Sequence, residues 1–284
     1  MNTSPNGVVC FYHGNCFDGI CAAWVVSLKY PDAEFIPVNY GDMGLMQSIQ
    51  QDCFENANIN THYVVVDFSF PRDLMIQMAN KAKSMIVLDH HQTNQKDCEG
   101  LDFCKFDMAE SGASLAWKHF FPTEPMPKIV QYVADQDLWK FELPYSREIN
   151  AYIQLFDMIL ENYNYLWKIL DSPMGLEIAV IGGQAIKQYK DTLVKRIVKS
   201  HRILDILGHR VAVVNSPVLM SEVGEALARL PGVIFGAYYF QRSDGMVQWG
   251  ARSIGDFDVS IVAKKFGGGG HKNAAGWQVE GKNP

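Results

Sequence analysis

The chain has 284 residues, of which 48% are hydrophobic and 20% are charged, the composition of a globular protein with a sizeable core. The formal net charge of −6 argues against a broad basic surface that would hold long duplex nucleic acid, so a nucleic-acid substrate must be short or gripped locally. The first 15 residues do not resemble a signal peptide, and no stretch reaches the roughly 18 apolar residues of a membrane span, so we expect a cytoplasmic protein without membrane contacts.

Short apolar runs alternate with amphipathic stretches over the first hundred residues. Strands are predicted at residues 7–12, 34–39, 63–67 and 84–89, with helices at 19–29, from 44 onward and at 72–83. The last of these strands is apolar without period-2 alternation, which is typical of a strand buried on both faces of a parallel sheet. This order predicts a doubly wound α/β domain, in which ligands bind beyond the carboxyl ends of the strands.

The rest of the chain predicts more helices and then a second unit. Helices are predicted at 111–121 and 128–139, and aromatic residues at helical spacing between 150 and 170 are assigned to the core. Apolar residues at three- and four-residue steps, with basic residues between them, predict a long helix over 186–207. Beyond it, strands at 210–215, 233–240 and 247–252 accompany helices at 221–230 and 259–266.

These elements predict two α/β domains joined by a long helix. The first, over residues 1–186, would be built on a mainly parallel sheet. Residues 187–207 would form the linker helix, and residues 208–284 a smaller second domain.

Polar side chains follow three predicted strands of the first domain, and one more lies near the end of the helix at 128–139. They are His13, Asp18, Asp67, Asp89, His90, His91 and Asp135. Each alone could cap a helix or bond within a loop. Together, however, carboxylates so close would repel one another unless a cation lies between them. Mixed oxygen and nitrogen donors suit Mn²⁺ or Mg²⁺ better than they suit a structural zinc ion.

Five segments, in order along nearly the whole chain, resemble the motifs of the DHH phosphoesterases and of their C-terminal DHHA1 domain. They are HGNCFDGICAA (13–23), VVVD (64–67), VLDHH (87–91), AD (134–135) and GGGGHKNAAG (267–276). A DHH or GGGH string alone would be weak evidence, but five motifs in register are strong. The resemblance implies a metal-dependent phosphoesterase. It also implies that residues 1–186 are the catalytic domain, that residues 208–284 are the substrate-binding domain, and that the active site lies in the cleft between them.

The resemblance also implies two metal ions, Mn²⁺ or another divalent metal. One would be held by His13 and Asp67. The other would be held by Asp18, Asp67, His90 and Asp135. Asp67 would therefore bridge them, while Asp89 and His91 would support the ligands or face the substrate. Such a pair, about 3.5–4 Å apart, predicts in-line attack of a metal-bridging hydroxide on phosphorus.

The first motif departs from the family pattern at one position. Many members place an additional aspartate between the histidine and the last aspartate, whereas residues 14–17 are Gly-Asn-Cys-Phe. The thiolate of Cys16, the amide oxygen of Asn15 or a water could replace it, and we rank water slightly ahead. Six cysteines in the first 104 residues form no C-x-x-C pair, which predicts reduced thiols.

The glycine run and an arginine are the candidate substrate-binding groups of the second domain. Backbone N–H groups of Gly268, Gly269 and Gly270 could approach a phosphate closely. His271 could donate a hydrogen bond to the same phosphate. Arg252 resembles the family's substrate-facing arginine, and its planar fork suits a phosphate or a base edge. The alternatives are a flexible turn for the glycines and a surface salt bridge for Arg252.

The leading prediction is a Mn²⁺-dependent phosphodiesterase, a nanoRNase that hydrolyses linear dinucleotides or very short oligoribonucleotides to 5′-mononucleotides. Trp139 is the aromatic candidate for lining its cleft. The enzymatic alternatives are a cyclic-dinucleotide phosphodiesterase and a 3′-phosphoadenosine 5′-phosphate phosphatase; degradation of long single-stranded DNA is less favoured. The alternative outside enzymes is a nucleotide-binding sensor that has lost hydrolysis. The resemblance also suggests a homodimer, although no sequence feature derives one.

Overall fold

The structure is a computed structural model that describes residues 7–40, 43–55 and 60–280. Residues 1–6, on which part of the expectation about targeting rests, and the side chain of Cys53 lie outside this description. The chain divides into two compact units, residues 1–186 and 187–284. In the part that is described, no helix has both the length and the apolarity that a membrane crossing requires. The cleft between the domains stays a prediction.

The first unit is built on a five-stranded parallel sheet with the order β2-β1-β3-β4-β5. Its strands are β1 (Val8–His13), β2 (Glu34–Val38), β3 (His62–Val66), β4 (Ser84–Asp89) and β5 (Cys104–Phe106). The chain runs from β1 outward to β2 and then back to β3 on the other side of β1. In sheets of this order, ligands bind beyond the carboxyl ends of β1 and β3, where the winding direction reverses.

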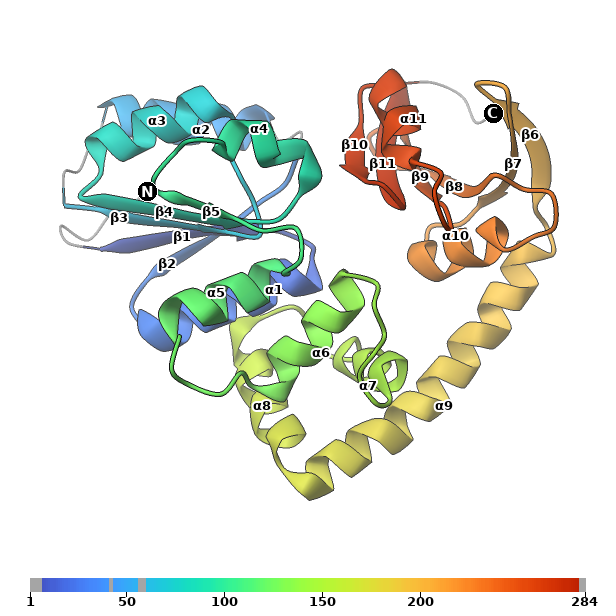
Figure 1. Cartoon of the computed structure of the whole chain (residues 1–284), viewed down its shortest axis with the longest axis horizontal. Helices are drawn as coiled ribbons and strands as arrows, with labels where there is room; N and C mark the ends of the chain where they lie inside the picture. Colours follow the sequence, from blue (N-terminus) through green and yellow to red (C-terminus); the bar gives the residue numbers. More distant parts are fainter. Residues whose placement is uncertain (1–6, 41–42, 56–59, 281–284) are drawn as a thin grey trace. The chain divides into compact units, whose positions relative to one another are not determined.

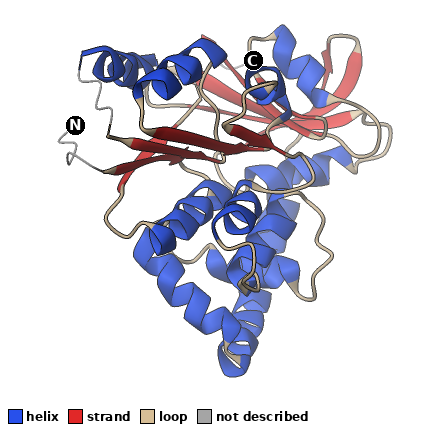
Figure 2. Ribbon diagram, turned by 60° about the vertical axis from the view of Figure 1, so that its left-hand side comes forward, coloured by secondary structure: helices blue, strands red, loops and turns tan. Residues whose placement is uncertain are grey.

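Helices cover both faces of this sheet, as the sequence predicts for a doubly wound fold (Figures 1 and 2). One face carries α1 (Phe17–Lys29) and α5 (Gly112–Phe120); the other carries α2 (Met43–Glu55), α3 (Arg72–Lys81) and, after the short turn η1 (Gln92–Asn94), α4 (Gln95–Cys98). Because successive strand residues point to opposite faces, Val64 packs in one core with Trp24, and Val65 packs in the other with Phe70 and Met75. Both faces are thus buried, which explains the absence of alternation.

Three further helices follow in the first unit: α6 (Lys128–Asp137), α7 (Ser146–Ile153) and α8 (Leu160–Asp171). Helices α6 and α8 add Val130 and Leu166 to the core on the α1 side of the sheet. The aromatic stretch is core only in part. Tyr163 is buried and its hydroxyl donates to the carbonyl oxygen of Phe17, whereas the side chain of Tyr165 is 48% exposed.

The helix predicted over residues 186–207 has the wrong bounds. Helix α9 runs over Pro173–Val198, and β6 (Arg202–Ile206) follows it as a strand. Pro173 suits the first helical turn, where no N–H is needed for an intrahelical bond. Strand β6 pairs with β7 through a two-residue turn at Leu207 and Gly208, both with positive φ (54° and 80°). Pairing within a sheet therefore overrides the helical spacing beyond residue 198.

The second unit is a six-stranded sheet with the order β10-β11-β9-β8-β7-β6, antiparallel except between β7 and β8. Its remaining elements are β7 (His209–Asn215), α10 (Met220–Ala228), β8 (Phe235–Gln241), β9 (Met246–Arg252), α11 (Val259–Lys265), β10 (Gly269–His271) and β11 (Ala274–Glu280). Val223 of α10 packs in one core with Val214, and Val259 of α11 packs in another with Val213. The predicted smaller α/β domain is confirmed.

Candidate metal centre

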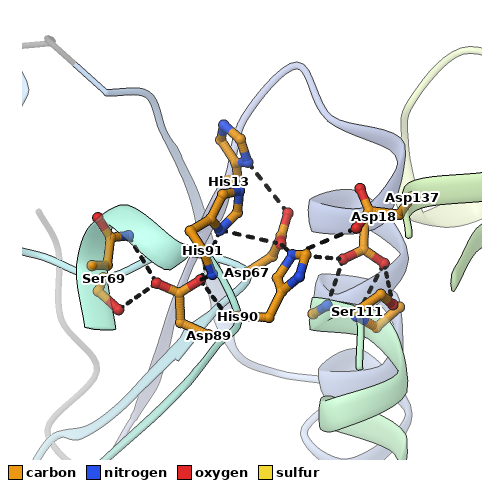
Figure 3. Close-up of polar contacts among 12 residues, drawn as sticks. His13, Asp18, Asp67, Ser69, Asp89, His90, His91, Ser111 and Asp137 are labelled. Carbon is orange, nitrogen blue, oxygen red and sulfur yellow. Dashed lines mark hydrogen bonds and ion pairs between the residues drawn. The ribbon is translucent and has the colours of Figure 1, made fainter. Parts of the chain in front are cut away.

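Acidic and imidazole side chains gather at the carboxyl ends of β1, β3 and β4 (Figure 3). Helices α1 and α6 bring two further carboxylates to the same place. The gathered side chains are those of His13, Asp18, Asp67, Asp89, His90, His91 and Asp137. Six of them belong to two groups of three, His13 with Asp67 and His91, and Asp18 with His90 and Asp137, whose potential ligand atoms lie within 4.8 Å of one another in each group.

Asp67 lies at the centre of this arrangement and is only 1% exposed. Its Oδ2 lies 3.3 Å from Nδ1 of His13, and its Oδ1 lies 3.1 Å from Nε2 of His90. One carboxylate therefore connects the two groups. Its backbone has a φ of 54°, a left-handed conformation that is strained for a residue with a Cβ atom. The backbone N–H of Asp67 donates to the carbonyl oxygen of Leu88 at 2.9 Å, which helps to hold this conformation.

The N-terminus of α5 lies directly against Asp67, and this approach requires a glycine. A Cβ atom on Gly112 would lie 2.4 Å from Cβ of Asp67. The backbone N–H of Gly112 donates to Oδ2 of Asp18 at 2.5 Å, and the hydroxyl of Ser111 donates to Oδ1 of Asp18 at 2.7 Å. Asp18 thus accepts bonds from the helix end whose N–H groups lack intrahelical partners. Sequence reasoning did not single out Ser111 and Gly112.

The carboxylates of this cluster are electrostatically opposed. Burial raises the pKa of Asp18 well above its usual range, and the charges of Asp67 and Asp137 raise it further. Burial also acts to raise the pKa of Asp67, but its hydrogen bonds with His13 and His90 outweigh this effect and hold the pKa well below the usual range. The acidic cluster therefore needs positive charge from its surroundings.

His90 supplies that charge in the metal-free protein. Burial acts to lower its pKa, but the hydrogen bond to Asp67 and the charges of Asp137, Asp67 and Asp18 raise it to about 10. The protonated imidazole thus lies between carboxylates, with Nε2 3.5 Å from Oδ2 of Asp137 and 3.9 Å from Oδ2 of Asp18. Oxygen and nitrogen donors around a site that attracts a cation fit a divalent metal ion.

Asp89 is fully used in positioning its neighbours. Its Oδ1 accepts bonds from the backbone N–H groups of His90 (2.8 Å) and His91 (3.2 Å) and from Nδ1 of His91 (2.8 Å). Its Oδ2 accepts bonds from Ser69 Oγ (2.6 Å) and Asn94 Nδ2 (2.8 Å). Although burial acts to raise the pKa of Asp89, the hydrogen bond and charge of His91 and the bonds from Asn94 and Ser69 lower it to about 2. Of the two roles left open for Asp89, the geometry favours support, and Ser69 and Asn94 were missed.

At the end of α6 the structure brings Asp137, and not the predicted Asp135, to the cluster. The carboxylate of Asp135 accepts bonds from the backbone N–H groups of Glu142 (3.0 Å) and Leu143 (3.3 Å), so it organises the loop after the helix. Asp137, two residues later, joins His90 instead. Residues two apart in an α-helix point to nearly opposite sides, so only one of these aspartates can face the cluster. The sequence Asp-Gln-Asp contained the signal, but the motif match selected the first carboxylate.

Cys16 precedes α1 and lies close to the cluster. Burial raises the pKa of its thiol well above the ordinary value, and the charges of Asp67 and Asp137 raise it further. The protonated thiol is therefore favoured in the metal-free protein, although a bound cation would reverse this preference. Which of Cys16, Asn15 or water completes the first group stays a prediction.

Arg252 ends β9 and packs on α10 of the second unit. Its Nη2 donates to Ser221 Oγ at 2.8 Å and its Nη1 to the carbonyl oxygen of Ala251 at 3.0 Å. Its guanidinium carbon lies 5.9 Å from the ring centroid of Tyr238. Among the described residues, Arg252 makes no ion pair with a carboxylate. The surface salt bridge considered above is thus not what holds this side chain.

The glycine run has structural reasons of its own. Gly267 follows α11 with a φ of 77°, its N–H donates to the carbonyl of Lys264, and the N–H of Gly268 donates to that of Ala263, which is the Schellman helix ending. A Cβ atom on Gly268 would lie 2.0 Å from the carbonyl oxygen of Gly276. His271 ends β10 and is half-buried. Phosphate binding by Gly268, Gly269, Gly270 and His271 stays a prediction.

Parts of the chain are similar in sequence to known proteins. Residues 211–283 match the DHHA1 domain. Over 96% of its length the chain is 28% identical to the uncharacterized protein R106 of Acanthamoeba polyphaga mimivirus, and the match covers 68% of that protein. A 66-residue stretch, 23% of this chain, is 36% identical to the cyclic-di-AMP phosphodiesterase GdpP of Geobacillus thermodenitrificans, of which it covers 10%.

Solved structures share the fold. An exopolyphosphatase-related protein from Bacteroides fragilis is similar with a TM-score of 0.58 and 13% identity, over 98% of this chain and 88% of that one. RecJ in complex with Mn²⁺ from Thermus thermophilus is similar with a TM-score of 0.51 and 12% identity, over 97% of this chain and 50% of that one. The second unit therefore carries a DHHA1 domain match, and the chain as a whole shares the fold of these two structures.

Proposed function

We propose that this protein is a divalent-metal-dependent phosphodiesterase that hydrolyses linear dinucleotides or very short oligoribonucleotides to 5′-mononucleotides. The observation that carries the proposal is the buried cluster centred on Asp67, in which two groups of three donors meet at one sheet edge. A structural role does not explain why carboxylates that disfavour one another's charge are gathered there.

The residues present fit two divalent ions. His13, Asp67 and His91 would hold one ion, and Asp18, His90 and Asp137 the other, with Asp67 reaching both groups. These oxygen and nitrogen donors suit Mn²⁺ first and Mg²⁺ second. When bound, the ions would supply positive charge that polarises the phosphodiester and acidifies a water molecule.

The chain's own residues orient this chemistry. Asp89 accepts a bond from Nδ1 of His91 at 2.8 Å, which fixes the direction of that imidazole, and it accepts bonds from both backbone N–H groups of the His90-His91 pair, which fixes the backbone there. Such carboxylate partners fix the tautomer and raise the basicity of a ligating histidine. The hydrogen bonds from α5 fix the carboxylate of Asp18 in the same way. Preorganised donors of this kind are what hydrolysis of a phosphodiester requires.

The preference for a short linear substrate rests on charge. A net charge of −6 offers little to a long polyanion, whereas a dinucleotide needs charge compensation only at the site itself. The role assigned to Arg252 and His271, binding of the distal phosphate, is part of this proposal. We also propose a cytoplasmic location and keep a homodimer as an expectation.

A second candidate is hydrolysis of cyclic dinucleotides. The local similarity to the cyclic-di-AMP phosphodiesterase of Geobacillus thermodenitrificans favours it over the 3′-phosphoadenosine 5′-phosphate phosphatase alternative, because it points to a diester substrate. The similarity covers 23% of this chain, so it supports the reaction type more than the substrate.

The experiment is a substrate comparison with Mn²⁺. Di-, tetra- and twenty-nucleotide RNAs, cyclic di-AMP and 3′-phosphoadenosine 5′-phosphate are incubated with the wild type, with His90→Ala and with His119→Ala. His119 lies near the other end of α5, bonded to Lys105, and is the matched control. We expect the dinucleotide to turn over fastest, His90→Ala to be inactive and His119→Ala to be unchanged. Faster turnover of the twenty-mer would contradict the proposal, and dinucleotide binding without turnover at any divalent metal would indicate a sensor.

A further inference from the structure

Trp139 is an exposed aromatic ring held in a strained backbone, in the loop that follows Asp137 of the acidic cluster. It follows Asp137 by two residues, its side chain is 38% exposed and its φ is 55°. Phe141 also has a left-handed backbone (φ 53°), and the two ring centroids lie 4.8 Å apart, edge to face. Non-glycine residues in this conformation are uncommon and concentrate at functional sites.

The loop that carries Trp139 is fixed from inside the protein. Asp135 accepts bonds from the N–H groups of Lys140 and Phe141 with its backbone carbonyl, in addition to the two that its carboxylate accepts. The guanidinium carbon of Arg147 lies 3.6 Å from the ring centroid of Phe141 and 5.6 Å from that of Trp139. The ring of Trp139 is therefore exposed but held in a fixed position. Folding alone does not require a fixed position for an exposed tryptophan ring.

A second exposed ring lies beside the other ligand group. The side chain of Tyr40 is 42% exposed, and its ring centroid lies 5.3 Å from that of His13 and 5.8 Å from that of His91. Phe68 supports it at 4.5 Å. The hydroxyl oxygen of Tyr40 accepts a bond of 2.6 Å from Nδ2 of Asn94, the same amide nitrogen that donates to Asp89. Tyr40 is thus tied to the residues that position His91.

We propose that Trp139 and Tyr40 are the base-stacking residues of this site, one beside each ligand group, and that they take the two nucleobases of a dinucleotide whose linking phosphate lies at the cluster. Asp67 lies between the two groups, with His13 and His91 on one side and Asp18 and Asp137 on the other (Figure 3). This inference rests on the proposed function and deepens it. Rigid aromatic rings beside a phosphate site bind bases through their faces, with little preference among the four.

The stacking role follows from the chemistry of the two side chains. The ring of Trp139 contacts Phe141 and Arg147. Tyr40 uses its hydroxyl toward Asn94, and its ring lies against the rings of His13, Phe68 and His91. Neither residue therefore presents a fork of donors and acceptors that would read a base edge. The substrate would accordingly be selected by its length, two bases and one linking phosphate, rather than by its sequence.

The test is binding of a dinucleotide whose linking phosphate is replaced by a non-hydrolysable methylenephosphonate. Isothermal titration calorimetry with Mn²⁺ compares the wild type with Trp139→Ala and Tyr40→Ala, and with Trp139→Phe and Tyr40→Phe as matched controls that keep an aromatic ring. Each alanine variant is expected to raise Kd by roughly 5- to 100-fold, and each phenylalanine variant is expected to stay within about threefold of the wild type. Unfolding curves of all four variants verify that the fold is retained.

A second ligand separates stacking from an indirect effect on the metal ligands. In the same dinucleotide with one base removed, one of the two alanine variants should no longer differ from the wild type. Alanine variants with unchanged Kd, or with equal losses for the intact and both abasic ligands, would overturn the inference. If the alanine variants show these losses in affinity but the wild type does not hydrolyse the natural dinucleotide, the proposed function is refuted and base stacking is left standing.

Discussion

Replacement of Asp137 and of Asp135 by asparagine should separate metal binding from folding. Oδ2 of Asp137 lies 3.5 Å from Nε2 of His90, and the side chain of Asp137 is 26% exposed. Asp137→Asn removes a charged donor from one ligand group, so the affinity for Mn²⁺ should fall by at least the roughly ten- to hundredfold typical of lost supporting groups. The free energy of unfolding of the protein without Mn²⁺ should change by no more than about 1 kcal/mol, because the ion pair between Asp137 and His90 is partly exposed.

Asp135→Asn should have the opposite profile. The carboxylate is buried and accepts two backbone N–H bonds, from Glu142 and Leu143, and an amide cannot accept both equally well. Bonds to a charged group contribute about 1.5–3 kcal/mol each, so the free energy of unfolding should fall by about 3 kcal/mol. Calorimetric Mn²⁺ titration and urea unfolding in EDTA measure the two effects. Loss of metal binding in Asp135→Asn at unchanged stability, with Asp137→Asn unaffected, would refute the assignment.

Three further perturbations test the supporting contacts. The folded-state pKa of Asp89 is about 2, below the ordinary 3.8, so its ionised form stabilises the fold by about 2 kcal/mol above pH 3.8. This contribution is lost as the pH falls toward 2. In acid unfolding, the difference in free energy of unfolding between the wild type and Asp89→Asn should therefore shrink below about pH 4, and a constant difference would contradict this. Because His90 holds a proton with a pKa of about 10, binding of Mn²⁺ should release a proton. The affinity of the protein for Mn²⁺ should therefore rise about tenfold per pH unit between about pH 7 and 9. Calorimetry in buffers of different ionisation enthalpy measures the released proton, and pH-independent binding would argue against His90 as a ligand. Gly112→Ala should destabilise the protein by about 1–3 kcal/mol and weaken metal binding, since its Cβ atom would meet that of Asp67; wild-type affinity and stability would mean that α5 moves freely.

The parallel sheet could be predicted because its physical cause is local. Strands buried on both faces cannot alternate, and the runs ending at Val66 and Leu88 show this directly in the sequence. The meeting of His13, Asp67 and His90 followed from the same argument, because parallel strands end at one edge. Side chains that directly follow parallel strands can thus be predicted from the sequence to lie close together.

The structure departs from the predictions where tertiary contacts decide between two local options. Residues 202–206 continue a helical spacing, yet β6 forms because β7 offers it a pairing partner. Asp135 and Asp137 are equally plausible ligands in a sequence, and only the loop formed by Glu142 and Leu143 shows which carboxylate is already occupied. The carboxylate of Asp18 accepts a bond from the N-terminus of α5, more than ninety residues away, so no local pattern could reveal this contact.

The most direct test of the metal centre is anomalous diffraction at the manganese edge from crystals grown with Mn²⁺. Two ion peaks are predicted, one in contact with His13, Asp67 and His91 and one in contact with Asp18, His90 and Asp137, both within reach of the Asp67 carboxylate. Absence of any ion at this sheet edge, or an ion ligated by Asp135 in place of Asp137, would contradict the account.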